Sequence, residues 1–149
     1  MEDIKKFIEH LECPIVDGII FPDKRIQLLE VEVLWQRPYE YSIKPSFFTS
    51  IDDLEAEGKL WTGHCGVLDK CVDILNGIKV ICGESSLGGD GFIAVLDMQT
   101  ERVIWIAFFT CSNPFDKVTV EEGQIVAVST LNCVWKLNIA NPVEIVVTC

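Results

Sequence analysis

The chain has 149 residues, of which 49% are hydrophobic, and 23 acidic against 12 basic residues give a net charge of −11. This hydrophobic share excludes intrinsic disorder and suits a single domain over residues 1–149 with a sizeable core. The acidic balance argues against nucleic-acid and membrane binding and favours a basic protein partner, although solubility alone also explains an acidic surface. The excess of acids is not confined to a tail, because residues 1–60 carry 13 acids and 7 bases and the remainder carries 10 and 5.

A short amphipathic helix is predicted over residues 2–12, ended by Pro14. Its apolar side chains recur at helical spacing: Ile4, Phe7, Ile8 and Leu11. The segment alternates charged and apolar residues, which is not typical of a secretory signal. The longest apolar run, 103–109, is far shorter than the roughly 20 residues that span a membrane. We therefore expect a soluble, cytoplasmic protein.

The next segments alternate as strands do. Residues 18–21 suit a strand and are followed by a Pro-Asp turn. Ile26–Trp35 predicts a second strand with one apolar face, whereas Glu30 and Glu32 share the other face. This strand is expected to be half exposed and acidic.

Two segments of the first half are harder to assign. Pro38 and Pro45 bracket a segment that we interpret as a polar loop containing Tyr39 and Tyr41. Over residues 60–76, apolar side chains at helical spacing favour a helix, followed by an Asn-Gly turn. Its apolar stripe comprises Val67, Leu68, Cys71, Val72 and Leu75.

A short acidic helix is predicted between these two segments. Ser50 followed by Asp53 is a variant of the capping box that begins a helix, and Gly58 ends it. Its acidic residues are Asp52, Asp53, Glu55 and Glu57. Acids in the first turn suit the helix dipole, so the cluster also has a structural explanation.

From residue 78 onward the sequence predicts strands only. Their ranges are 78–83, 92–98, 102–111, 117–121, 124–130, 133–139 and 143–148. Short turns between them imply an antiparallel meander. Strands 92–98 and 102–111 are apolar on both faces and should be central and covered on both sides. We predict a mainly β domain (α+β at the margin), with helix and strands in 1–77, a continuous antiparallel region in 78–149 and one to three short peripheral helices.

The cysteines favour free thiols over a disulfide scaffold. Their number, seven, is odd. Cys82, Cys111 and Cys133 lie in apolar strand-like runs, where a free thiol packs as a small hydrophobe. The four tryptophans are likewise expected in the core: Trp35, Trp61, Trp105 and Trp135.

No motif of catalysis, metal binding or cofactor binding stands out. His64 and Cys65 are adjacent, which is poor geometry for a nucleophile and its base, and no Cys or His spacing is that of a zinc site. The glycine-rich loop 83–91 leads into a strand and lacks lysine, so positive φ angles in a β-connection explain it better than phosphate binding. We expect no cofactor, no metal site and no catalytic residue.

Two family resemblances meet in one segment. Gly88-Gly89-Asp90-Gly91, Leu96-Asp97 and Arg102-Val103-Ile104-Trp105 resemble the SUKH-type superfamily of bacterial toxin-immunity proteins. Leu96-Asp97, Thr100 and Trp105 are also similar to a quinoprotein-type β-propeller blade. A weak self-match of residues 93–97 with 134–138 accompanies the second resemblance, but a propeller needs 4–8 blades. Both resemblances imply a β-sheet surface used for binding.

Three hypotheses on function follow. The leading one, implied by the SUKH-type resemblance and the acidity, is an immunity protein that covers the active site of a basic toxin such as a nuclease. Its predicted contact residues are Glu30, Glu32, Tyr39, Tyr41, Asp52, Asp53, Glu55 and Glu57, with the tyrosines as anchors. The alternatives are a small-ligand protein or thiol enzyme that uses His64 and Cys65, and a structural β module that self-associates through strand edges.

Overall fold

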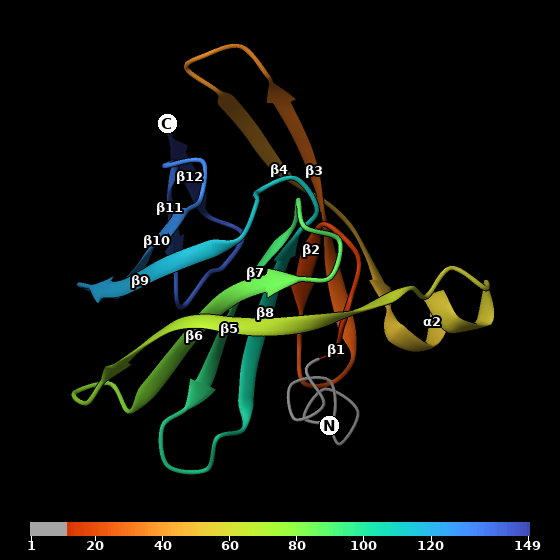
Figure 1. Ribbon diagram of the computed structural model, residues 1–149. Coiled ribbons are helices and arrows are strands. Elements are labelled where there is room, and N and C mark those ends of the chain that lie inside the picture. Colours follow the sequence, from red (N-terminus) through yellow and green to blue (C-terminus); the bar gives the residue numbers. More distant parts are fainter. Residues whose placement is uncertain (1–11) are drawn as a thin grey trace.

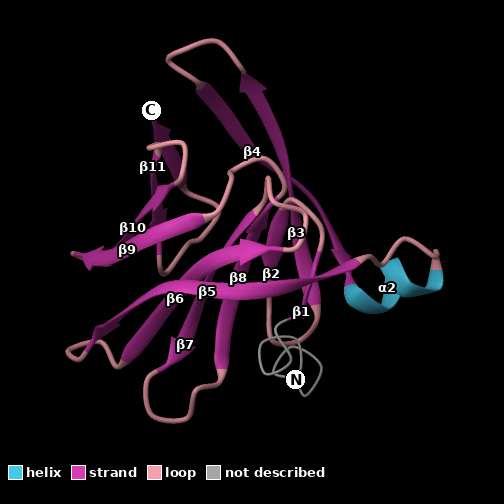
Figure 2. Cartoon of the chain, viewed as in Figure 1, coloured by secondary structure: helices cyan, strands magenta, loops and turns pink. Residues whose placement is uncertain are grey.

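The computed structural model describes residues 12–149, so the predicted helix over residues 2–12 lies outside the described residues, except that Glu12 already begins a strand. The described chain is mainly β (Figures 1 and 2). Its elements are β1 (Glu12–Pro14), β2 (Gly18–Ile20), β3 (Arg25–Leu34), β4 (Glu40–Ser50), α2 (Ile51–Ala56), β5 (Thr62–Asp73), β6 (Ile78–Ser85), β7 (Gly91–Asp97), β8 (Val103–Phe109), β9 (Phe115–Glu121), β10 (Gln124–Ser129), β11 (Val134–Asn138) and β12 (Ile145–Thr148).

The strands form two antiparallel sheets that face one another. The large sheet has the order β1-β5-β6-β7-β8-β2-β3-β4, and the small sheet has the order β12-β11-β10-β9. Each sheet contains a meander of consecutive strands, as predicted, but β8 pairs with β2 from the N-terminal half. The β region therefore begins at β1 and is not limited to residues 78–149. Because the two sheets share one core, the described residues form a single compact domain.

The central strands β7 and β8 are buried on both faces except at Ile104, near the start of β8, which confirms the prediction from their two-sided apolar pattern. Val95 and Phe109 join Trp135 of the small sheet in the inter-sheet core, the buried cluster between the two sheets. Phe92 and Phe108 point to the opposite face. There they join Ile51 and Leu54 of α2 and Ile26 of β3 in a second cluster, the outer core. Alternate side chains of one strand thus supply two cores.

The turns around β7 explain the residues that carry the family resemblances. Gly88 has a φ of +83°, and a Cβ at Gly91 would lie 2.5 Å from the carbonyl oxygen of Asn113. After β7, the Asp97 carboxylate accepts hydrogen bonds from the backbone N–H groups of Thr100 at 2.8 Å and Gln99 at 3.0 Å. These bonds lower the pKa of Asp97. The glycines and Asp97 thus shape two β-turns.

The predicted loop between Pro38 and Pro45 is a strand. Residues 40–50 form β4, which pairs with β3 from Glu40↔Leu34 to Ser50↔Arg25. Proline is tolerated because β4 is the outermost strand of the large sheet, where one side of the backbone needs no partner. The register shifts between Gln27 and Leu29, and Pro45 pairs with Leu29 at this irregularity. The prediction of a loop was wrong because it gave Pro45 too much weight.

The predicted helix over residues 60–76 is also a strand, β5, followed by the expected turn. Its register with β6 shifts between Val67 and Asp69, where an extra residue is inserted. This bulge interrupts the alternation and leaves Val67 and Leu68 exposed next to one another. The interruption imitates the spacing of a helical stripe. Within residues 12–149, α2 is consequently the single helix.

Two expectations about buried side chains were wrong. Cys133 forms a disulfide with Cys149. The pairing of Val134 with Thr148 places Cys133, just before β11, opposite Cys149, just after β12, with Cα atoms 4.1 Å apart. Trp105 and Trp135 are core residues, but Trp35 and Trp61 are exposed. No helix of the described chain has the length and hydrophobicity to cross a membrane.

Candidate functional site

The outward face of β3 carries the acidic strip that the sequence predicts. Glu30 and Glu32 are exposed, whereas Leu29 and Val31 on the other face pack into the inter-sheet core. Across the strand pair, Glu30 lies opposite Lys44 and Glu32 opposite Ser42. Within residues 12–149, neither carboxylate forms an ion pair at 4.0 Å or less. Their negative charge is therefore presented to solvent.

The helix α2 presents a second acidic surface, and its cap is the predicted one. The Ser50 hydroxyl accepts a hydrogen bond from Asp53 N at 3.0 Å, while Ile51 and Leu54 anchor the helix in the outer core. Four acidic side chains are exposed: Asp52, Asp53, Glu55 and Glu57.

Two of these carboxylates are partly neutralised. Asp52 and Glu57 have lysine partners, Lys24 and Lys59, each at 3.5 Å. Among the described residues, Asp53 and Glu55 have no ion-pair partner. The helix therefore adds unpaired negative charge to the surface.

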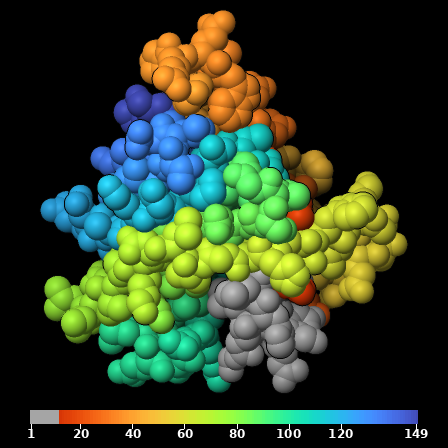
Figure 3. All heavy atoms as spheres, viewed as in Figure 1, coloured from red at the N-terminus to blue at the C-terminus, as the bar shows by residue number. Residues whose placement is uncertain are grey.

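The two acidic groups lie on one side of the large sheet but do not merge. Ile26 and Leu28, on the same face of β3 as Glu30, pack with α2 in the outer core. However, the free end of the β3–β4 hairpin projects at the top of the molecule, whereas α2 lies at the right margin (Figures 1 and 3). A partner that touches both would have to lie along the length of β3.

The predicted tyrosine anchors belong to a stack of aromatic rings. Tyr41 is half-buried, its hydroxyl donates to the Cys111 carbonyl oxygen at 2.8 Å, and its ring centroid lies 5.0 Å from that of Trp135. Burial raises the pKa of Tyr41 to about 12. Trp35 stacks edge-on against Tyr39 at 5.5 Å and Tyr41 at 6.2 Å, and it remains 56% exposed. The stack thus fixes the hairpin to the core and presents Trp35, which the sequence analysis assigned to the core, at its free end.

Other exposed aromatic side chains flank α2. Phe47 and Phe48, near the end of β4, are 70% and 56% exposed, and Trp61, just before β5, is 71% exposed. The Arg25 guanidinium lies 5.6 Å from the centre of the Phe48 ring. Large exposed aromatic groups beside a charged surface are typical of protein interfaces. The signal missed in the sequence was the pair Phe47-Phe48, which cannot place both rings inside one sheet face.

The alternative site at His64 and Cys65 is divided between two faces of β5. His64 is exposed, whereas Cys65 is buried and lies near Cys13 of β1. The hydrogen bond with Cys65 and burial raise the pKa of the Cys13 thiol well above its usual value. This environment disfavours a reactive thiolate at Cys13. Across residues 12–149, no group of three or more His, Cys, Asp or Glu side chains is arranged to hold a metal ion.

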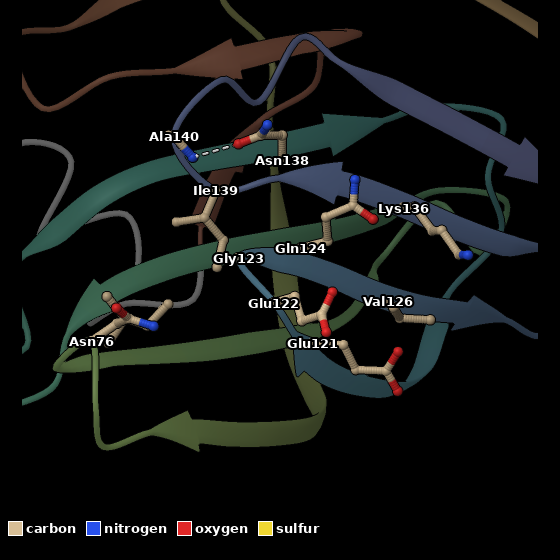
Figure 4. A pocket seen from close by; sticks show the side chains of 11 residues that line it. Asn76, Glu121, Glu122, Gly123, Gln124, Val126, Lys136, Asn138, Ile139 and Ala140 are labelled. Carbon is tan, nitrogen blue, oxygen red and sulfur yellow. Dashed lines mark hydrogen bonds between the residues drawn. The ribbon is translucent and has the colours of Figure 1, made fainter.

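A groove that the sequence analysis did not predict lies at the opposite side of the molecule from α2. A cavity of about 1230 Å³ on the small sheet and one of about 610 Å³ beside β5 share Asn76, Glu122 and Gly123. We call the combined cavity the turn groove, because these three residues belong to the β5–β6 and β9–β10 turns. Gln124 and Lys136 line it from the outward face of the small sheet (Figure 4).

The comparisons with known proteins add no relative. No protein-family model matches the chain, and it has no significant match among curated proteins or solved structures.

Proposed function

We propose that this protein is a binding module that captures a basic protein partner through the acidic side of the large sheet. The observation that carries the proposal is the unpaired carboxylates on β3 and α2 together with exposed aromatic side chains on the same β3–β4 unit. Carboxylates that are not neutralised raise the rate of encounter with a cationic surface. Exposed aromatic rings supply the apolar area that holds a partner once it has docked.

The finer proposal is an immunity protein that acts in the bacterial cytoplasm on a toxin such as a nuclease. A nuclease active site is basic because it binds phosphates, so an acidic cover competes directly with the substrate. The SUKH-type resemblance of residues 88–105 motivates this choice. The resembling residues shape turns and central strands, whereas the proposed contacts lie on β3, α2 and the hairpin end.

The test begins with capture of partners from the source cytosol by the wild-type chain and by a neutralised variant. The variant carries Glu30→Gln, Glu32→Gln, Glu55→Gln and Glu57→Gln, all at exposed positions. We expect a basic protein that the wild type retains and the variant loses. Expressed alone this partner should stop growth, and co-expression of the wild-type chain should restore it.

Two outcomes would contradict the proposal. One is a set of captured proteins that does not differ between the wild type and the variant. The other is a partner that is not toxic or whose toxicity the wild-type chain does not relieve.

Light scattering on the isolated chain tests the self-association alternative. The edge strand β4 carries Lys44 and Pro45, which oppose edge-to-edge pairing, so we expect a monomer.

A further inference from the structure

We propose that the turn groove binds an extended basic segment of a second protein. The inference deepens the proposed function, because it gives a basic partner a contact region separate from β3 and α2. It depends on that function only for the identity of the partner.

The size and construction of the groove favour a peptide segment over a small molecule. Its larger cavity, about 1230 Å³, exceeds the roughly 300–1,000 Å³ that is usual for small-ligand sites. Its lining comes from two turns and from the outward face of β10 and β11, and Figure 4 shows these side chains spread along the strands. Such a long, open surface suits an extended chain of several residues.

The rim of the groove carries apolar side chains without a partner in the described chain. Leu75 is 97% exposed, Ile74 is 78% exposed and Val72 is 51% exposed. All three line the smaller cavity from the end of β5 and the turn after it. Three exposed aliphatic side chains within four residues are unfavourable in water unless another apolar surface covers them. The occupant should therefore carry apolar residues.

The charge of the groove selects a basic occupant. Its charged lining consists of Asp73, Glu121 and Glu122 against Lys136 alone. Glu121 and Glu122 are exposed and, within residues 12–149, form no ion pair. The Gln124 amide can bond to the backbone of an extended segment, whereas Asn76 Nδ2 already donates to the Asp73 carboxylate at 2.7 Å. A segment that alternates lysine or arginine with apolar residues complements both the carboxylates and the aliphatic rim.

The β9–β10 turn offers a variant that separates binding from stability. Glu122 has a φ of +50° and Gly123 a φ of +77°, as in a type I′ turn. Asparagine adopts this left-handed conformation more readily than glutamate does. Glu122→Asn should therefore remove a groove carboxylate without loss of stability, so weaker binding by this variant is not explained by unfolding.

The experiment uses an extended synthetic peptide of about eight residues in which lysine alternates with leucine and valine. A matched peptide carries glutamate in place of lysine. Each is titrated into the isotope-labelled full-length chain, and NMR shift changes map the binding surface. The variants are Glu121→Gln, Glu122→Asn and Leu75→Ser, and the matched control is Glu84→Gln, at an exposed position of β6 outside both the groove and the proposed acidic contacts.

We expect saturable shifts at Asn76, Gly77, Glu122 and Gly123 with the lysine peptide and none with the glutamate peptide. Each groove carboxylate variant should weaken affinity about twofold to fivefold, and Leu75→Ser about tenfold, with Glu84→Gln unchanged. The inference is overturned if no saturable binding occurs, if the groove variants bind as well as the wild type, or if the shifts map to β3 and α2. The last outcome would leave the proposed function supported, since it locates cation binding on the predicted acidic side.

Discussion

The two hairpins β7–β8 and β3–β4 belong to the same sheet and have opposite roles. Both faces of β7 and β8 are buried, with Ile93 and Phe108 fully inaccessible to solvent. In β3–β4, alternate positions are exposed, and the free end carries Trp35 and Leu34 in solvent. The contrast separates residues selected for packing from residues available to a partner. The segment on which the sequence analysis based its family resemblances is the packed one, whereas the proposed contacts lie on the other hairpin.

The largest expected difference in stability is between variants of two tryptophans of the aromatic stack, the buried Trp135 and the exposed Trp35. Trp135→Ala should lower the free energy of unfolding by about 3–5 kcal/mol, because it leaves a cavity beside Phe109 and Phe115. Trp35→Ala should cost about 1 kcal/mol or less, since the side chain is half exposed. Urea denaturation of both variants measures the difference. Equal losses would contradict the assignment of Trp35 to a surface role.

Loss of the disulfide should have the next largest effect on stability. Reduction of Cys133–Cys149, which closes a loop with a sequence separation of 16, should lower stability by about 3 kcal/mol. Denaturation with and without dithiothreitol measures it, and Cys149→Ser should match the reduced wild type. Cys71→Ser, at a free cysteine, is the control. A function in the cytoplasm, where thiols are kept reduced, requires that the reduced chain stays folded.

A smaller effect concerns the attachment of the β3–β4 hairpin. Tyr41→Phe removes the hydrogen bond to the Cys111 carbonyl oxygen and should cost about 1 kcal/mol. The wild type should also lose stability at alkaline pH, and the variant should not show this loss. Burial raises the pKa of Tyr41 from 10.0 to about 12 in the folded chain, so the folded state holds its proton longer than the unfolded state. The stabilisation is fully present below pH 10 and is lost as the pH rises toward 12.

Denaturation as a function of pH, followed by circular dichroism, measures this loss. If the wild type and Tyr41→Phe lose stability in parallel between pH 10 and 12, Tyr41 does not fix the hairpin. Tyr39→Phe is a suitable control, because among the described residues the Tyr39 hydroxyl donates no hydrogen bond to the inter-sheet core.

The sequence predicted the parts of the fold that depend on local signals. The strands from residue 78 onward follow from alternation and turn residues, and so does the cap at Ser50. Pairing between distant segments was not predictable, because no local pattern places β2 beside β8. A proline at an edge and a bulge beside Val67 concealed β4 and β5.

The candidate site divides in the same way. Exposure of Glu30, Glu32 and the acids of α2 follows from alternation and capping. The contacts of Tyr41 in the aromatic stack and the exposure of Trp35 depend on how the β3–β4 hairpin packs against the small sheet. The turn groove is made by two turns that are distant in sequence, so no motif marks it.

The smallest effect on stability is expected where the effect on binding is largest. Glu30→Gln with Glu32→Gln should change the free energy of unfolding by less than about 0.5 kcal/mol, because both side chains are exposed and unpaired among the described residues. The corresponding change in the central hairpin, Ile93→Gln with Phe108→Gln, should abolish folding. Retention of the fold by the second variant would contradict the division between the two hairpins.

The most direct test of the account is the salt dependence of binding to the captured basic partner. Titration calorimetry across a series of salt concentrations compares the wild type with the variant neutralised at Glu30, Glu32, Glu55 and Glu57. We expect the wild-type affinity to fall steeply as salt is raised and the variant to show a weaker affinity with a shallower dependence, because screening acts on these carboxylates. An affinity independent of salt, or the same dependence in both proteins, would contradict a partner held by the acidic side of the large sheet.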